Sequence, residues 1–153
     1  MIKLKSLIIN LIIPLAVGGL SGFLTMNSME VYKNLNQPNF APPSIAFPIV
    51  WAILYVLMGI STYMIYESGS PLKNRALIVY GTQLVVNFIW PLIFFNAGMY
   101  LFAFIWLIAL WILVLWMTIL FYKIKHAAAY FQIPYLLWLT FAAYLNFAIY
   151  LLN

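Results

Sequence analysis

Aromatic and amide side chains are the residues in this sequence with the clearest chemical potential. Trp51 and Trp138 carry indoles, the most readily oxidised side chains in a chain without cysteine. Gln83 and Asn87 are four residues apart and share a helix face, which Trp90 continues three residues later. Aromatic faces with a few amides are the usual lining of a site for a flat apolar ligand.

Neighbouring residues extend this pattern. Tyr55 follows Trp51 by four residues, and Ala142 follows Trp138 at the same spacing. Pro91 has no N–H for the carbonyl of Asn87, which predicts a free oxygen and a kinked helix. These residues are therefore predicted to line a cavity, and the alternative is that amides join helices while aromatic rings pack. Three further indoles have no polar neighbours in the sequence and are interpreted as packing or lipid-facing: Trp106, Trp111 and Trp116.

Several kinds of chemistry are excluded. The absence of cysteine rules out disulfides and thiolate nucleophiles, and the single histidine, His126, has no metal-ligating companions. No metal site, hydrolytic nucleophile or acid–base pair is visible. No charged residue lies in the middle of an apolar run, which argues against an ion-coupled pump.

The composition indicates which elements hold these residues. Of 153 residues, 67% are hydrophobic and 6% are charged, against roughly half and a quarter in soluble domains. The chain is therefore predicted to be an all-α integral membrane protein, a single five-helix bundle in the lipid bilayer. The apolar runs that form the spans cover about residues 6–26, 45–66, 76–95, 99–122 and 127–152. A signal peptide is the alternative for the first run.

The basic residues predict an orientation. Six lie before the first span or in the connections after the second and fourth: Lys3, Lys5, Lys73, Arg75, Lys123 and Lys125. The opposite side has Lys33, with Glu30 nearby. The positive-inside rule then places the N-terminus in the cytoplasm and the C-terminus outside. The net charge of +5 thus reflects topology, and no nucleic-acid partner is expected.

The connection from residue 27 to residue 44, here called the lid segment, is much longer than the others. Its prolines restrict the chain, and its aromatic residues can anchor it on the bundle. We interpret it as a lid on the outer face, with an ordinary linker as the alternative. The residues behind this interpretation are Pro38, Pro42 and Pro43, with Tyr32, Leu35 and Phe40.

Four motifs in order resemble the translocator protein family, also called tryptophan-rich sensory proteins or peripheral benzodiazepine receptors. They are Pro38-Asn39-Phe40-Ala41-Pro42-Pro43, Phe47-Pro48-Ile49-Val50-Trp51, Gln83-Leu84 with Asn87, Trp90 and Pro91, and Ile133-Pro134-Tyr135-Leu136-Leu137-Trp138. The resemblance implies a ligand cavity near the first loop, with Trp51, Asn87, Trp138 and Ala142 as ligand positions and lid contacts near Tyr32 and Pro42.

The resemblance also implies partners. They are protoporphyrin-type tetrapyrroles, as ligand or substrate and not as a resident cofactor, and isoquinoline or benzodiazepine drugs. Sterol binding is not expected, because Tyr150 is followed by Leu151-Leu152-Asn153 without the basic residue of the eukaryotic consensus. A bacterial plasma membrane is the expected location. Small residues such as Gly18, Gly19 and Gly22 permit close helix packing or a homodimer face.

Three functional hypotheses follow. The first is a tetrapyrrole receptor that promotes light- and oxygen-dependent porphyrin breakdown, with Trp51 and Trp138 as the reactive residues. The second is a passive transporter of porphyrin or another lipophile. The third is a membrane interaction protein whose cavity is only structural. Product analysis after illumination separates the first hypothesis from the others.

Overall fold

A computed structural model describes residues 2–153, and this part of the chain is helical without strands. Five helical stretches are long and apolar enough to cross a membrane, as predicted. The main helices are α1 (Leu4–Thr25), α3 (Ala46–Tyr66), α4 (Lys73–Pro91), α5 (Tyr100–Ile124) and α7 (Ile133–Leu152). Shorter pieces are a 3-10 turn η1 (Met26–Ser28), α2 (Met29–Asn34), a π-helical turn η2 (Leu92–Asn96) and α6 (His126–Tyr130).

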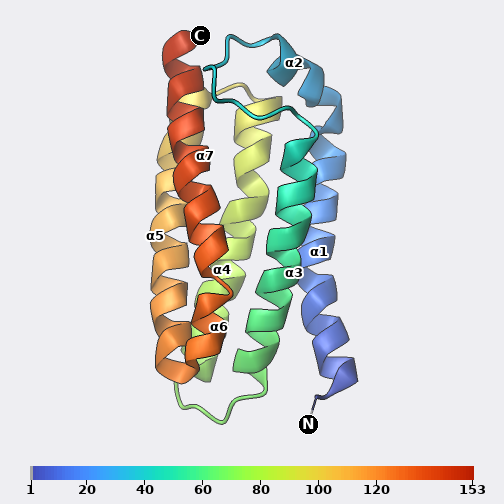
Figure 1. Ribbon diagram of the computed structural model, residues 1–153, viewed down its shortest axis with the longest axis vertical. Coiled ribbons are helices and arrows are strands. Elements are labelled where there is room, and N and C mark those ends of the chain that lie inside the picture. The colour runs from blue at the N-terminus through green and yellow to red at the C-terminus, as the bar shows by residue number, and fades with distance from the viewer. Residues whose placement is uncertain (1) are drawn as a thin grey trace.

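The five long helices form an elongated bundle (Figure 1). Helix α1 packs mainly against α3 and also against α4, while α5 packs against both α4 and α7. Helices α3 and α7 face each other largely through aromatic side chains, among them Trp51 and Trp138. Leucine, isoleucine and phenylalanine side chains cover the outside, as expected for a surface that lies in lipid.

Proline residues lie at two interruptions of the long helices. Pro91 ends α4, and the chain continues as the π-helical turn η2. The predicted last span is divided at Phe131 and Gln132, just before Pro134 at the start of α7. Proline fits the first turn of a helix because the N–H groups there have no intrahelical partner.

Small residues allow α1 and α3 to approach closely. A Cβ atom added at Gly59 would lie 2.8 Å from the carbonyl oxygen of Asn10 and 2.8 Å from the Cα of Leu11. A Cβ added at Gly18 would collide with the ring of Tyr55. Glycine at these two positions therefore allows the backbone of α1 to lie directly against α3 and the ring of Tyr55 to lie directly against α1.

The lid segment is helical in its first part, where a loop was expected. After α1, the chain continues through η1 and α2 before it becomes extended at Leu35. Tyr32 is buried and packs edge-on against Phe47 and Phe95, with ring centroids 5.3 and 5.8 Å away. The first part of the lid segment is thus an extension of α1 that is held by aromatic contacts.

The second part of the lid segment is attached to α7. The ring of Phe40 lies 5.1 Å from that of Tyr144. The backbone N–H of Asn36 donates to Oδ1 of Asn153 at 3.1 Å, and Nδ2 of Asn153 donates to the carbonyl of Asn36 at 2.9 Å. The lid segment therefore connects α1 to α7 at the end of the bundle opposite Lys3.

The two described ends of the chain lie at opposite ends of the bundle, as an odd number of spans requires (Figure 1). The six basic residues named above lie at the end of the bundle that holds the first residues of the chain. At this end Lys3 forms an ion pair with Glu67 at 3.5 Å. Lys33 lies at the other end, on α2. The charge asymmetry that predicts the orientation is therefore present in three dimensions.

We expect a reporter fused after Asn153 to appear outside the cytoplasm, because the end that is rich in lysine and arginine is retained inside. Alkaline phosphatase activity together with weak fluorescence of a cytoplasmic reporter measures this. A cytoplasmic C-terminus would contradict the orientation and would place the lid segment on the inner side.

Candidate functional site

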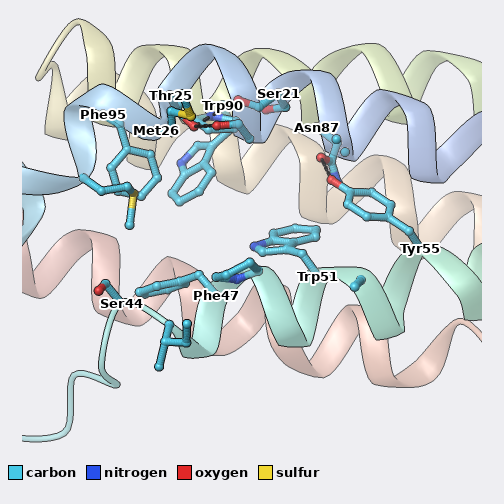
Figure 2. A pocket seen from close by; sticks show the side chains of 18 of the residues that line it. Ser21, Thr25, Met26, Ser44, Phe47, Trp51, Tyr55, Asn87, Trp90 and Phe95 are labelled. Carbon is cyan, nitrogen blue, oxygen red and sulfur yellow. Dashed lines mark hydrogen bonds between the residues drawn. The ribbon is translucent and has the colours of Figure 1, made fainter.

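A cavity of about 630 Å³ lies between α1, α3 and α4 beside the lid segment. This volume is within the range of small-molecule sites. Figure 2 shows its aromatic lining, with Trp51 and Phe47 on α3 opposite Trp90 and Phe95. The cavity is predominantly apolar, so it suits a ligand that partitions from the membrane.

Two neutral polar side chains close the deep end of the cavity. The hydroxyl of Tyr55 donates to Oδ1 of Asn87 at 2.8 Å, and Nδ2 of Asn87 donates to the hydroxyl of Tyr135 at 2.6 Å. The Tyr135 hydroxyl in turn donates to Oε1 of Gln83 at 2.7 Å. Because these groups are buried, the network fixes Tyr55 and Asn87 where both can meet a ligand.

Trp51 is the central aromatic residue of the site. Its ring stacks on Tyr55 at 5.5 Å and lies edge-on to Tyr135 at 6.0 Å. Across the cavity, Nε1 of Trp90 donates to Oδ1 of Asn146 at 3.1 Å, and its ring stacks on Phe94 at 5.2 Å. Both indoles are therefore fixed by neighbours, so the cavity has rigid aromatic walls before a ligand arrives.

Trp138 lies behind Trp51 and does not line the cavity. The two ring centroids are 6.4 Å apart and the planes are nearly perpendicular. Its other neighbours are Phe47, at 6.0 Å, and Phe141, at 5.4 Å. Nε1 of Trp138 is buried and has no hydrogen-bond partner among residues 2–153. The indole pair is thus arranged in series, with Trp51 at the cavity and Trp138 deeper in the aromatic cluster.

The remaining predicted site residues do not line the cavity. Tyr32 supports Phe47 and Phe95 from behind, and Gln83 belongs to the buried network below Asn87. Pro42 lies in the lid segment, and Ala142 is buried on α7. Of the predicted ligand-binding residues, the cavity brings together Trp51, Tyr55, Asn87 and Trp90.

Helix α1 forms a wall of the cavity that the sequence patterns did not predict. Gly19 and Gly22 line the cavity, and an added Cβ atom at either would meet nothing within 4 Å. Thr25 and Met26 continue this wall toward the lid segment. The sequence signal for this wall is the run of small residues at helical spacing, which predicts close helix packing. In the structure, Gly18 alone of the three glycines packs closely, against Tyr55, whereas Gly19 and Gly22 leave open space.

The side chains of the site are neutral apart from one lysine at the rim. Within residues 2–153, Lys33 is the one charged residue that lines the cavity. The same part of the chain has no group of three or more histidine or carboxylate side chains that could hold a metal ion. The arrangement can therefore bind and orient a flat apolar molecule by stacking and by hydrogen bonds from Tyr55 and Asn87.

Fold and site together define a five-span membrane protein with an aromatic cavity at one end of its bundle. The chain belongs to the TspO/MBR family, whose model matches residues 10–152.

Relatives with similar sequences occur in distant organisms. The chain is 36% identical to the "Tryptophan-rich protein TspO" of Archaeoglobus fulgidus over 152 residues, which is 99% of each chain. It is 34% identical to the "Tryptophan-rich sensory protein" of Cereibacter sphaeroides, over 81% of this chain and 77% of the relative. It is 30% identical to the "Translocator protein" of Sus scrofa, over 87% and 83%. The predicted family is thereby confirmed.

Proposed function

We propose that this protein binds protoporphyrin-type tetrapyrroles in the cavity and promotes their light- and oxygen-dependent breakdown. The observation that carries the proposal is the indole of Trp51, which faces the cavity and has the indole of Trp138 6.4 Å behind it. Flat drug-like ligands of the isoquinoline and benzodiazepine type would use the same aromatic walls. The proposed location is a bacterial plasma membrane, with the cavity on its outer side.

The proposed chemistry uses the ligand, light and oxygen. A porphyrin excited by light takes an electron from the indole of Trp51, and the reduced porphyrin adds oxygen at a carbon of the macrocycle. Trp138, whose ring is the next one in the cluster, reduces the oxidised Trp51, and the oxygen adduct returns one electron to the indole pair. The net change is the addition of one O2 to the macrocycle, which opens it, and both indoles end as they began. The macrocycle is the substrate in this scheme, and the protein supplies orientation and an electron donor.

A binding protein is favoured over a passive transporter by the packing below the cavity. Met58, Ser61 and Gln83 are fully buried at and below the level of the polar network. Ser61 also donates to the carbonyl of Ala128 at 2.7 Å, which joins α3 to α6. A passage for a macrocycle would require these contacts to separate, whereas binding at the outer end requires no such change.

The deciding experiment is product analysis of protoporphyrin IX illuminated with the purified protein in lipid nanodiscs. We expect loss of the porphyrin absorbance together with a defined set of products, and neither in the dark or without oxygen. Empty nanodiscs under the same light measure the uncatalysed bleaching. Binding without any change in products would reduce the proposal to a receptor.

Substitution of Asn87 tests the polar end of the cavity. We expect Asn87→Leu to weaken binding of carbonyl-bearing drug ligands by about 1–2 kcal/mol, the scale of one buried hydrogen bond. The variant also leaves the hydroxyl of Tyr55 without its acceptor and removes the donor to the hydroxyl of Tyr135, so its melting temperature should fall. Isothermal titration and thermal unfolding measure the two effects.

Tyr135→Phe is the matched control, because it disrupts the same network from outside the cavity wall. It should lower stability while Asn87 still offers its amide to the ligand, so affinity should fall less than in Asn87→Leu. Equal affinity of Asn87→Leu and wild type would mean that Asn87 serves only to join helices.

A further inference from the structure

The polarity of the cavity changes with depth. Tyr55 and Asn87, at the deep end, are neutral, and the middle is aromatic. Lys33 lines the cavity from the last turn of α2, in the lid segment. A long apolar cavity with one ammonium group at its rim is matched by a flat molecule with an acidic edge.

The ammonium group of Lys33 is available to such a ligand. Its only ion pair within residues 2–153 is with Glu30, at 3.5 Å and three residues away. The Lys33 side chain is 52% exposed and that of Glu30 is 78% exposed. An exposed pair of this kind contributes little, so an incoming carboxylate can replace Glu30 at small cost. The methylene stem of lysine can stay along the apolar wall while the charge remains at the membrane surface.

We propose that Lys33 selects flat ligands that carry a peripheral carboxylate and orients them with the acidic edge toward the lid segment. This proposal rests on the proposed function, since it specifies the ligand class of the same cavity. A carboxylate at the deep end would lose its hydration on burial. Nothing would compensate for this loss, because no cation lines that part of the cavity in the described chain. The apolar edge of the ligand therefore goes in first, toward Tyr55 and Trp51.

The test compares acids with their esters, which share the flat ring system but lack the charge. Protoporphyrin IX and its dimethyl ester form one pair, and 1-pyrenebutyric acid and its methyl ester form a second pair without a tetrapyrrole. Binding is measured by quenching of tryptophan fluorescence in nanodiscs of phosphatidylcholine, so that no anionic lipid competes for Lys33. For Lys33→Gln we expect affinity for each acid to fall about threefold to tenfold, with affinity for each ester unchanged.

Three variants complete the comparison. Lys33→Arg keeps the charge and should retain the preference for the acids. Glu30→Gln removes the competing carboxylate and should strengthen binding of the acids. Lys123→Gln, at the other end of the bundle, is the matched control and should change the affinity for neither the acids nor the esters. Added salt should weaken binding of the acids to wild type more than to Lys33→Gln.

The outcomes separate this proposal from the proposed function. If Lys33→Gln weakens binding of the acid and of the ester equally, or weakens binding of neither, Lys33 does not recognise the carboxylate and the proposal is overturned. Binding of the esters would then still support the cavity as the site. If the pyrene acid shows the dependence on Lys33 but neither porphyrin binds, the carboxylate preference stands and tetrapyrrole binding fails.

Discussion

Trp51→Phe should keep protoporphyrin IX in the cavity and stop its light-driven breakdown. Phenylalanine preserves an aromatic face beside Tyr55, so binding should weaken by no more than about 1 kcal/mol, the scale of one aromatic contact beyond area burial. It removes the indole that faces the ligand, so breakdown under illumination should fall at least about tenfold, as expected when a positioned reacting group is lost. Fluorescence quenching measures binding, and porphyrin absorbance under constant light measures turnover.

Trp138→Phe tests whether the second indole supplies an electron to Trp51 without itself contacting the ligand. Trp138 lies 6.4 Å behind Trp51 and outside the cavity wall, so its loss should leave affinity unchanged. Breakdown of the porphyrin should stop in this variant as well if Trp138 is needed to reduce the oxidised indole of Trp51. Trp116→Phe, an exposed indole on α5, is the matched control for a lost tryptophan. If Trp51→Phe and Trp138→Phe both degrade the ligand at the wild-type rate, the indoles only pack, and the protein is a receptor.

Gly22→Leu should abolish ligand binding in a protein that still folds. An added Cβ atom at Gly22 meets nothing within 4 Å, and the residue lines the cavity, so the new side chain extends into the space that a ligand needs. We expect affinity for both protoporphyrin IX and its dimethyl ester to fall tenfold or more, about 1.4 kcal/mol at least. Titration and a thermal melt on the same sample measure affinity and folding.

Gly81→Leu is the control for this substitution. Gly81 is exposed on α4, has equal room for a Cβ atom and does not line the cavity. It should bind normally. Wild-type affinity in the Gly22→Leu variant would mean that the ligand binds elsewhere, for example between α3 and α7 beside Trp138.

The fold was predictable because the apolar runs are long and the charges lie between them. The helix bounds differ from the predicted ones mainly where tertiary contacts decide the backbone. Residues 29–34 are helical since Tyr32 docks between Phe47 and Phe95, which are far away in the sequence. Local composition, with prolines soon after, indicated only a loop.

The site was predictable in part, since spacing along one helix reveals a shared face but not the helix that lies opposite. The spacing pattern placed Trp51 and Asn87 at one cavity, and both residues line the cavity in the structure. It also predicted Trp138 there, because nothing in the sequence says that Trp51 stands between Trp138 and the open space. Likewise, Trp106 and Trp111 find hydrogen-bond acceptors on other helices, the carbonyl of Val86 and the hydroxyl of Thr140.

The amide pair of Asn36 and Asn153 has a consequence for the time course of binding. Neither residue lines the cavity, so their two hydrogen bonds add nothing to the contacts of a bound ligand. These bonds, together with the one from Nδ2 of Asn36 to the carbonyl of Leu152 at 3.3 Å, must break before the lid segment can swing away from α7. We expect them to slow passage of a ligand in both directions, and so to change its residence time without changing the equilibrium constant. In stopped-flow traces, Asn153→Ala should accelerate association and dissociation by the same factor.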